Sequence, residues 1–169
     1  MRSSAEVQTG ARLEDQPEFM RQAIELATKN VTGGLGGPFG ALVVRDGEVI
    51  ATGVNRVTAS NDPTAHAEVT AIRSACQRLG TYVLESCDLY TSCEPCPMCL
   101  AAIYWAHCRA VFYGSTAADA ARAGFDDSRL YAEMRRPIRA RSLPMTQMLA
   151  EEALASFAAW QAAPGKVKY

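Results

Sequence analysis

Apolar residues recur along the chain at two spacings, one typical of helices and the other of strands. Pro17 suits the first position of a helix, and the apolar residues after it follow one helical face: Phe19, Met20, Ala23, Ile24 and Ala27. Two β-rich runs come next, over residues 39–44 and 49–54. Asp46-Gly47 between them is a strong hairpin signal. The pattern therefore predicts a helix followed by a β-hairpin.

The rest of the chain continues to alternate between helical and strand patterns. Short strands are expected at residues 88–91, 110–113 and 138–143, and helices at 64–79, about 97–106 and about 146–162. The second of these helices is apolar nearly all round, so we expect it to be buried. The order of elements predicts an α/β fold, a three-layer α-β-α sandwich around a mixed, roughly five-stranded sheet.

Length and composition are those of one globular domain. The 169 residues suit a single core, which we place at residues 17–169 after a polar tail of residues 1–16. The sequence contains neither an apolar run near the roughly 20 residues of a membrane helix nor the apolar stretch of a signal peptide. The six cysteines are therefore expected to be reduced thiols in the cytoplasm, available for metal binding or catalysis.

The formal net charge of −1 gives no overall reason to expect nucleic-acid binding. One local exception is a basic run near the C-terminal end, made of Arg135, Arg136, Arg139 and Arg141. A solvated surface explains such a run, and a patch that contacts phosphates is the alternative.

A histidine–glutamate pair and a cysteine pair form the motif with the clearest chemistry. His66 and Glu68 are two residues apart, and Cys96 and Cys99 follow further along the chain. The H-x-E…P-C-x-x-C pattern is the signature of zinc nucleobase deaminases. A thiolate in the first turn of a helix is stabilised by the helix dipole. Three protein ligands, His66, Cys96 and Cys99, are the number typical of catalytic zinc, whose fourth position takes water.

The same motif assigns the proton transfers to Glu68. Zinc lowers the pKa of bound water to about 7, and a nearby carboxylate can take a proton and deliver it to the ring nitrogen and the departing amine. Residues two apart on a regular helix point away from each other. His66 and Glu68 can therefore share a site only at the start of a helix.

The cysteines allow two other interpretations, an iron–sulfur cluster and a closed structural zinc site. Cys93, Cys96 and Cys99 form C-x-x-C-x-x-C, which is typical of iron–sulfur proteins, but the position of the next ligand is Ile103. A closed structural zinc site would add Cys93 to the three ligands and leave Glu68 without a role. The structural zinc module stays open as the non-enzymatic alternative.

Five stretches of the chain carry a family resemblance. Residues 63–69 and 91–99 contain the metal motif and look like the cytidine deaminase-like superfamily. Residues 36–41, 103–106 and 124–128 narrow the resemblance to the small bacterial guanine deaminases. It covers nearly the whole chain beyond the tail.

The resemblance implies one zinc ion per subunit and a role for each matched residue. Besides the zinc ligands and Glu68, Asn55 would hold the carbonyl of the base and Phe39 would stack on its ring. Trp105 would help to line the pocket. Asp127, grouped with Glu68 as a catalytic residue, would contact the guanine edge. The family also implies a homodimer in which the C-terminal segment, about residues 144–169, is swapped, so that Tyr169 closes the neighbour's pocket.

The implied reaction is hydrolysis of guanine to xanthine and ammonia, a step of purine catabolism or salvage. Guanine presents N1–H and a 2-amino group side by side, a pair of donors that suits a carboxylate such as Asp127 and that cytosine and adenine lack. Two alternatives within the superfamily remain, an adenosine deaminase acting on tRNA and a cytosine or nucleoside deaminase. The basic run near Arg135 is the only electrostatic support for tRNA, so we expect a small-molecule substrate.

Overall fold

The computed structural model describes residues 16–168, and it divides into two compact units between Asp126 and Asp127. The predicted tail, apart from its last residue Gln16, and the predicted pocket residue Tyr169 lie outside the described residues. The assignment of residues 17–169 to a single domain, with its swapped segment, stays a prediction.

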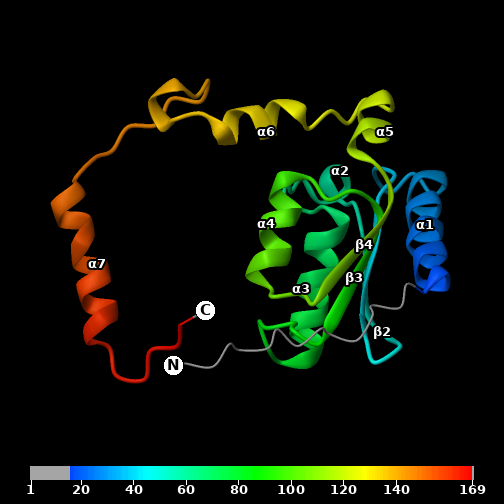
Figure 1. Cartoon of the computed structure of the whole chain (residues 1–169), viewed down its shortest axis with the longest axis horizontal. Coiled ribbons are helices and arrows are strands. Elements are labelled where there is room, and N and C mark those ends of the chain that lie inside the picture. Colours follow the sequence, from blue (N-terminus) through cyan, green and yellow to red (C-terminus); the bar gives the residue numbers. More distant parts are fainter. Residues whose placement is uncertain (1–15, 169) are drawn as a thin grey trace, which may run out of the picture. The chain divides into compact units, whose positions relative to one another are not determined.

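The first unit contains a sheet with helices on both faces (Figure 1). Its strands are β1 (Gly40–Arg45), β2 (Glu48–Val54), β3 (Cys87–Cys93) and β4 (Ala110–Ser115). Its helices are α1 (Pro17–Thr32), α2 (Val57–Ser60), α3 (Ala67–Leu79), α4 (Pro97–Trp105) and α5 (Ala117–Arg122).

The sheet is mixed, and its order is β2-β1-β3-β4. Strand β1 is antiparallel to both β2 and β3, whereas β3 and β4 are parallel. Helix α1 packs on one face through Phe19 and Ala23, and α3 and α4 pack on the other through a core that includes Ala71 and Ile103. The predicted three-layer α-β-α sandwich is confirmed.

The sheet has four strands among the described residues, not the roughly five that were expected. The prediction of a strand at residues 138–143 is wrong, because a short 3-10 helix, η1 (Ile138–Ala140), lies there. Pro137 precedes this turn and Pro144 follows the segment, and neither residue has an N–H to donate to a sheet. Ile138 and Leu143 are exposed, so the short apolar alternation does not correspond to a buried strand face.

Close packing at Gly53 fixes the start of α3 against the end of β2. A Cβ atom at Gly53 would lie 2.2 Å from the carbonyl oxygen of Ala67 and 2.5 Å from the backbone nitrogen of Ala71. Only glycine permits this approach between strand and helix. The contact brings the first turn of α3 beside the residues that follow β2, where Asn55 lies.

Helix α4 is only partly buried, contrary to its all-apolar pattern. Pro97, Cys99 and Ile103 are buried, whereas Tyr104 is 74% and Trp105 65% exposed. A helix in an outer layer of the sandwich buries one face against the sheet and its neighbouring helix. The expectation of complete burial is therefore wrong for the described chain.

The second unit consists of α6 (Ser128–Arg135), η1 and α7 (Ala150–Ala162). None of these elements has a buried residue. Helix α7 exposes large apolar side chains, namely Leu154, Phe157 and Trp160. None of the helices over residues 16–168 combines the length and apolarity that crossing a membrane requires.

Candidate metal centre and active site

The two halves of the metal motif lie at the starts of two helices. His66 immediately precedes α3 and has an extended backbone (φ −70°, ψ 158°). Cys96 precedes α4 in the same way (φ −64°, ψ 167°), and Pro97 occupies the first helical position. Because His66 lies outside the helix, the helical rule that separates residues two apart does not apply to it. Glu68, in the first turn of α3, can therefore serve the same site.

The donor atoms of His66, Cys96 and Cys99 converge. All three lie within 4.8 Å of one another, and Nδ1 of His66 is 3.5 Å from the Sγ atom of each cysteine. Tetrahedral zinc with ordinary bond lengths places a nitrogen and a sulfur ligand about 3.6 Å apart. Two sulfur donors and one imidazole at these separations fit a zinc ion.

The two thiols of the group have opposite acidities. A hydrogen bond with Cys99, helped by one with His66, lowers the pKa of Cys96 to about 4. The hydrogen bond with Cys96, together with burial and the nearby Glu68, raises the pKa of Cys99. The surroundings of Cys96 favour its thiolate, and zinc binding would deprotonate Cys99 as well, because cysteine ligates a metal as the thiolate.

Glu68 is buried beside the metal group. Its Oε1 accepts a hydrogen bond from Thr91 Oγ1 at 3.1 Å, and its Oε2 accepts one from Cys99 Sγ at 3.4 Å. Burial raises the pKa of the Glu68 carboxyl, which is 5% exposed. The side chain is therefore fixed in orientation within hydrogen-bond distance of one of the three donors.

Asn55 is held next to the glycine-containing loop that precedes β1. Its Oδ1 accepts hydrogen bonds from the backbone N–H groups of Gly37 (3.4 Å) and Val57 (3.3 Å). Its backbone N–H donates to the carbonyl oxygen of Phe39 at 3.1 Å. Asn55 is 8% exposed. These contacts join two of the predicted base-binding residues, Asn55 and Phe39, in one local structure.

Phe39 contacts an aromatic residue that the sequence did not single out by itself. The rings of Phe39 and Phe125 meet edge to face, with centroids 5.0 Å apart and planes at 85°. Phe125 belongs to residues 124–128, which contributed to the family resemblance. The contact ties the end of the first unit to the predicted stacking residue.

The structure leaves three predicted residues without a demonstrated place in the site. Trp105 is the last residue of α4, at the opposite end of the helix from Cys96. Asp127 begins the second unit and precedes α6 without making a side-chain capping hydrogen bond. Tyr169 is outside the described residues. Their roles stay predictions.

Three polar side chains around the site were given no role by the sequence analysis, although Thr91 and Glu94 lie within residues 91–99 of the family resemblance. Thr91 lies on β3, whose residues are all buried, and its hydroxyl donates to Glu68. Glu94 accepts a hydrogen bond from the backbone N–H of Ala117 at 2.9 Å and so ties the motif loop to α5. Asn30, on α1, donates to the backbone carbonyl of Asn55 at 2.8 Å. Hydrogen bonds between residues so distant in sequence are set by the fold, and only the types of these residues can be read beforehand.

Cys93 lies outside the metal group. Its Sγ donates to the carbonyl oxygen of Thr116 at 3.7 Å, and the group of converging donors found among the described residues contains His66, Cys96 and Cys99 without it. This arrangement is that of a three-ligand site, and it argues against the closed structural zinc site with four protein ligands.

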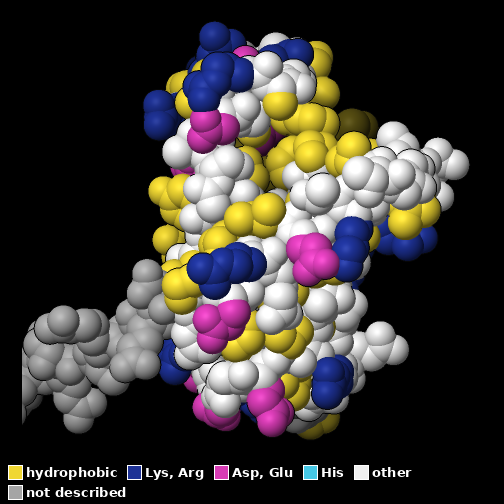
Figure 2. Space-filling view, turned by 90° about the vertical axis from the view of Figure 1, so that its right-hand side faces the viewer, with side chains coloured by type: hydrophobic (Ala, Val, Ile, Leu, Met, Phe, Trp, Pro, Cys, Tyr) yellow, Lys and Arg dark blue, Asp and Glu magenta, His cyan; other side chains and the backbone are white. Residues whose placement is uncertain are grey.

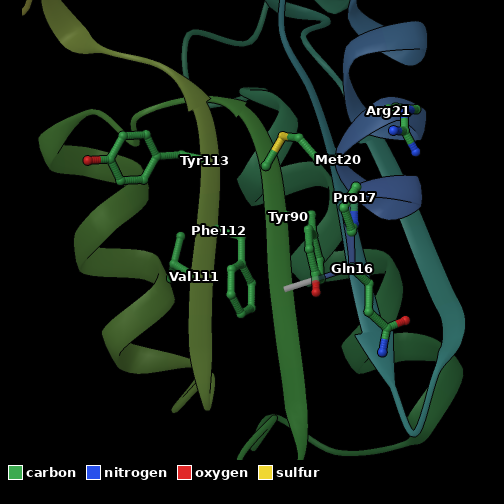
Figure 3. A pocket seen from close by; sticks show the side chains of 8 residues that line it. All are labelled: Gln16, Pro17, Met20, Arg21, Tyr90, Val111, Phe112 and Tyr113. Carbon is green, nitrogen blue, oxygen red and sulfur yellow. The ribbon is translucent and has the colours of Figure 1, made fainter. Parts of the chain in front are cut away.

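A groove of about 550 Å³ lies on the other face of the sheet, between α1 and strands β3 and β4 (Figure 3). Tyr90 and Phe112, with rings stacked at 4.6 Å, form part of its floor. Its eight lining residues include no histidine, cysteine or carboxylate. The groove therefore lacks the groups that the chemistry needs, and it is separate from the metal centre.

Comparisons with known proteins agree with this geometry. The family model for the cytidine and deoxycytidylate deaminase zinc-binding region matches residues 13–115. The guanine deaminase of Bacillus subtilis (strain 168) is 56% identical over 151 residues, which are 89% of this chain and 97% of that protein. The X-ray structure of guanine deaminase from Bacillus subtilis matches with a TM-score of 0.90 and 54% identity, over 92% of this chain and 99% of that one.

The similarity to tRNA deaminases is shorter. The tRNA-specific adenosine deaminase of Agrobacterium fabrum (strain C58 / ATCC 33970) is 51% identical over 78 residues, which are 46% of this chain and 51% of that protein. The resemblance to guanine deaminase, in contrast, extends through the C-terminal part. This chain belongs to the zinc-dependent cytidine and deoxycytidylate deaminase family, within which it is a homologue of bacterial guanine deaminase.

Proposed function

We propose that this enzyme hydrolyses guanine, so that guanine and water yield xanthine and ammonia, in purine catabolism or salvage. The observation that carries the proposal is the group of His66, Cys96 and Cys99 with the carboxylate of Glu68 hydrogen-bonded at its side. The choice of guanine is supported by similarity to guanine deaminase over nearly the full length of both chains.

His66, Cys96 and Cys99 would hold the zinc ion, and Glu68 would move the protons. The ion, when bound, supplies a Lewis acid that lowers the pKa of a coordinated water to about 7. Glu68 would take one proton from the attacking water and deliver it to a ring nitrogen, and would then take the second proton from the hydroxyl that has added to the ring and deliver it to the departing amine. Thr91, by donating to Oε1 of Glu68, keeps the carboxylate in one orientation through both transfers.

Asn55 and Phe39 would bind the base. With Oδ1 of Asn55 accepting from two backbone N–H groups, its Nδ2 is the donor that suits a carbonyl oxygen of the base. Phe39 offers an aromatic ring, whose edge-to-face contact with Phe125 restricts its rotation. Trp105 is a further proposed residue of the pocket that would hold the base.

We propose that Asp127 selects guanine by accepting hydrogen bonds from N1–H and the 2-amino group. The similarity to guanine deaminase over nearly the full length of both chains supports this role. Asp127→Asn is expected to lower kcat/KM for guanine about 10- to 200-fold. The substitution replaces one carboxylate oxygen, a hydrogen-bond acceptor, with an NH2 group that would face a hydrogen-bond donor of the base. Steady-state kinetics measure this change. Asp126→Asn is the matched control, and an equal loss in both variants would remove Asp127 from guanine recognition.

We further propose a homodimer in which the segment of about residues 144–169 crosses to the partner, so that Tyr169 closes the neighbour's pocket. The exposed apolar residues of α7 and its lack of buried residues support this, because such a helix needs another surface to cover it. Light scattering is expected to give twice the mass of the 18.2 kDa chain. A monomer at micromolar concentration would contradict the proposal.

Subunit mixing tests the exchange of Tyr169 directly. A Tyr169→Ala protein with reduced activity should regain activity when refolded together with an inactive Glu68→Gln protein, because the Glu68→Gln chain donates an intact Tyr169 to the neighbour's site. A dimer whose activity does not rise on mixing would place Tyr169 in its own subunit.

A substrate panel separates guanine from the alternatives within the family. Guanine, guanosine, adenine, cytosine and an adenosine-containing tRNA anticodon stem are compared by ammonia release from the zinc-loaded protein. We expect guanine to give the highest kcat/KM. On the face shown in Figure 2, basic side chains over the middle and lower parts lie among acidic ones, which does not favour a polyanion there. Turnover of the RNA alone would overturn the assignment.

The cytoplasm is the proposed location. All six cysteines are free, and the two that would bind zinc must stay reduced to act as ligands. A reducing compartment meets this requirement.

A further inference from the structure

Asn30 forms a buried hydrogen-bond bridge that lies outside the deaminase motif. Its side chain comes from the last turn of α1 and is 2% exposed. Nδ2 donates to the backbone carbonyl of Gly37 at 2.9 Å and to that of Asn55 at 2.8 Å. A primary amide has two N–H groups, so these two acceptors occupy both.

The bridge is part of a closed ring of three residues. The N–H of Gly37 donates to Oδ1 of Asn55 at 3.4 Å, so the two residues joined by Asn30 are also joined to each other. A displacement of Asn55 relative to Gly37 therefore acts on all three hydrogen bonds, and a large one breaks at least one of them. The ring holds the backbone and the side chain of Asn55 at the same time.

Packing around the ring leaves little room for adjustment. A Cβ atom at Gly36 would lie 2.2 Å from the carbonyl oxygen of Asn55 and 3.0 Å from Nδ2 of Asn30. Gly36 thus lets the loop pass directly over the bridge. A side chain here would push apart the groups that the bridge connects.

Among the described residues, the side-chain amide of Asn30 acts only as a hydrogen-bond donor. Its Oδ1 is buried and has no hydrogen-bond partner among the described residues. An unsatisfied buried acceptor is unfavourable, and an apolar side chain of similar size would avoid that penalty. The two donated hydrogen bonds are what an asparagine adds at this position.

We propose that Asn30 is a positioning residue for substrate recognition, which locks Gly37 and Asn55 together and thereby aims the amide of Asn55 at the base. The inference rests on the proposed role of Asn55 in binding the base. Asn30 acts through Asn55 and makes no contact with the substrate itself. Its effect falls on binding geometry, where a displacement of about 1 Å can change rates by about 100-fold.

A double-mutant cycle with Asn55 tests this coupling. Asn30→Ala is expected to lower kcat/KM for guanine about 10- to 100-fold, mainly through KM, with zinc content unchanged. In an Asn55→Ala background, the same substitution should lower kcat/KM less than about 3-fold, because the group that it positions is already absent. Equal fold losses in the two backgrounds would overturn the proposal.

A second variant reaches the ring without changing Asn30. Gly36→Ala should reproduce the rise in KM, because its methyl group pushes against the same carbonyl. Gly34→Asn is its control in the same loop, since that position has open space around it and a φ of +66° that asparagine tolerates. Phe19→Leu, at a buried position of α1 that packs on the sheet, controls for loss of stability. A rise in KM of similar size in either control would also overturn the proposal.

Hydrogen exchange separates a failure of this inference from a failure of the proposed reaction. Amides of residues 35–40 and 53–57 should exchange faster in Asn30→Ala than in wild type, and those of Phe19→Leu should not. If wild-type protein deaminates no guanine, the proposed function fails, while unchanged exchange in these two segments would by itself refute the Asn30 bridge.

Discussion

Glu68→Gln is expected to lose about 10²- to 10⁴-fold or more in kcat while it keeps its zinc, as removal of a general acid–base implies. Glutamine has nearly the same shape and can still accept from Thr91 at the Oε1 position. It cannot take up or deliver the proton. The loss should therefore appear in turnover rather than in folding or metal binding.

The measurement combines steady-state kinetics with zinc content by elemental analysis. Glu94→Gln is the matched control, because Glu94 is a nearby carboxylate whose contact is with the backbone of Ala117. It should retain far more activity than Glu68→Gln. Full activity in zinc-loaded Glu68→Gln would remove Glu68 from the mechanism.

Cys99→Ser is expected to abolish zinc binding at stoichiometric concentration and activity with it. Cys99 is fully buried, and its sulfur lies 3.5 Å from Nδ1 of His66, so no neighbouring thiol can replace it without rearrangement. We expect the affinity for zinc to fall more than about 100-fold, beyond the effect of losing an outer-shell partner.

Cys93→Ser is the control that separates the two forms of zinc site. Its sulfur contacts the carbonyl oxygen of Thr116, so the variant should keep one zinc per chain. X-ray absorption of the wild-type protein should give two sulfur ligands. Three sulfurs, with loss of zinc in Cys93→Ser, would indicate a closed structural site instead. Circular dichroism of both variants identifies any loss of zinc or of activity that results from unfolding.

Local signals in the sequence predicted the first half of the fold well. Asp46-Gly47 forms the hairpin turn, with φ of 52° and 77°, as a two-residue turn with positive φ requires. The helix stop at Gly80 was also readable, because caps depend on neighbouring residues, whereas α3 begins at Ala67 and not at the predicted residue 64. The prediction of a strand at residues 138–143 was wrong because a short apolar alternation carries no information on burial.

The metal group was predictable and its surroundings were not. His66, Cys96 and Cys99 are identified by type and spacing, and the fold needs only to bring two helix starts together. Thr91 and Asn30 are ordinary polar residues in sequence, and their importance depends on partners 23 and 25 residues away. Such contacts exist only once β3 and α1 are packed against the rest.

We propose above that this chain uses water to replace the 2-amino group of guanine. The most direct measurement is mass spectrometry of the product formed from guanine by the zinc-loaded protein in ¹⁸O-enriched water. We predict xanthine carrying one ¹⁸O atom and one ammonia released per xanthine, with neither product formed after the zinc is removed by a chelator. If guanine remains unchanged after incubation with folded, zinc-loaded protein, the proposed hydrolysis of guanine is wrong.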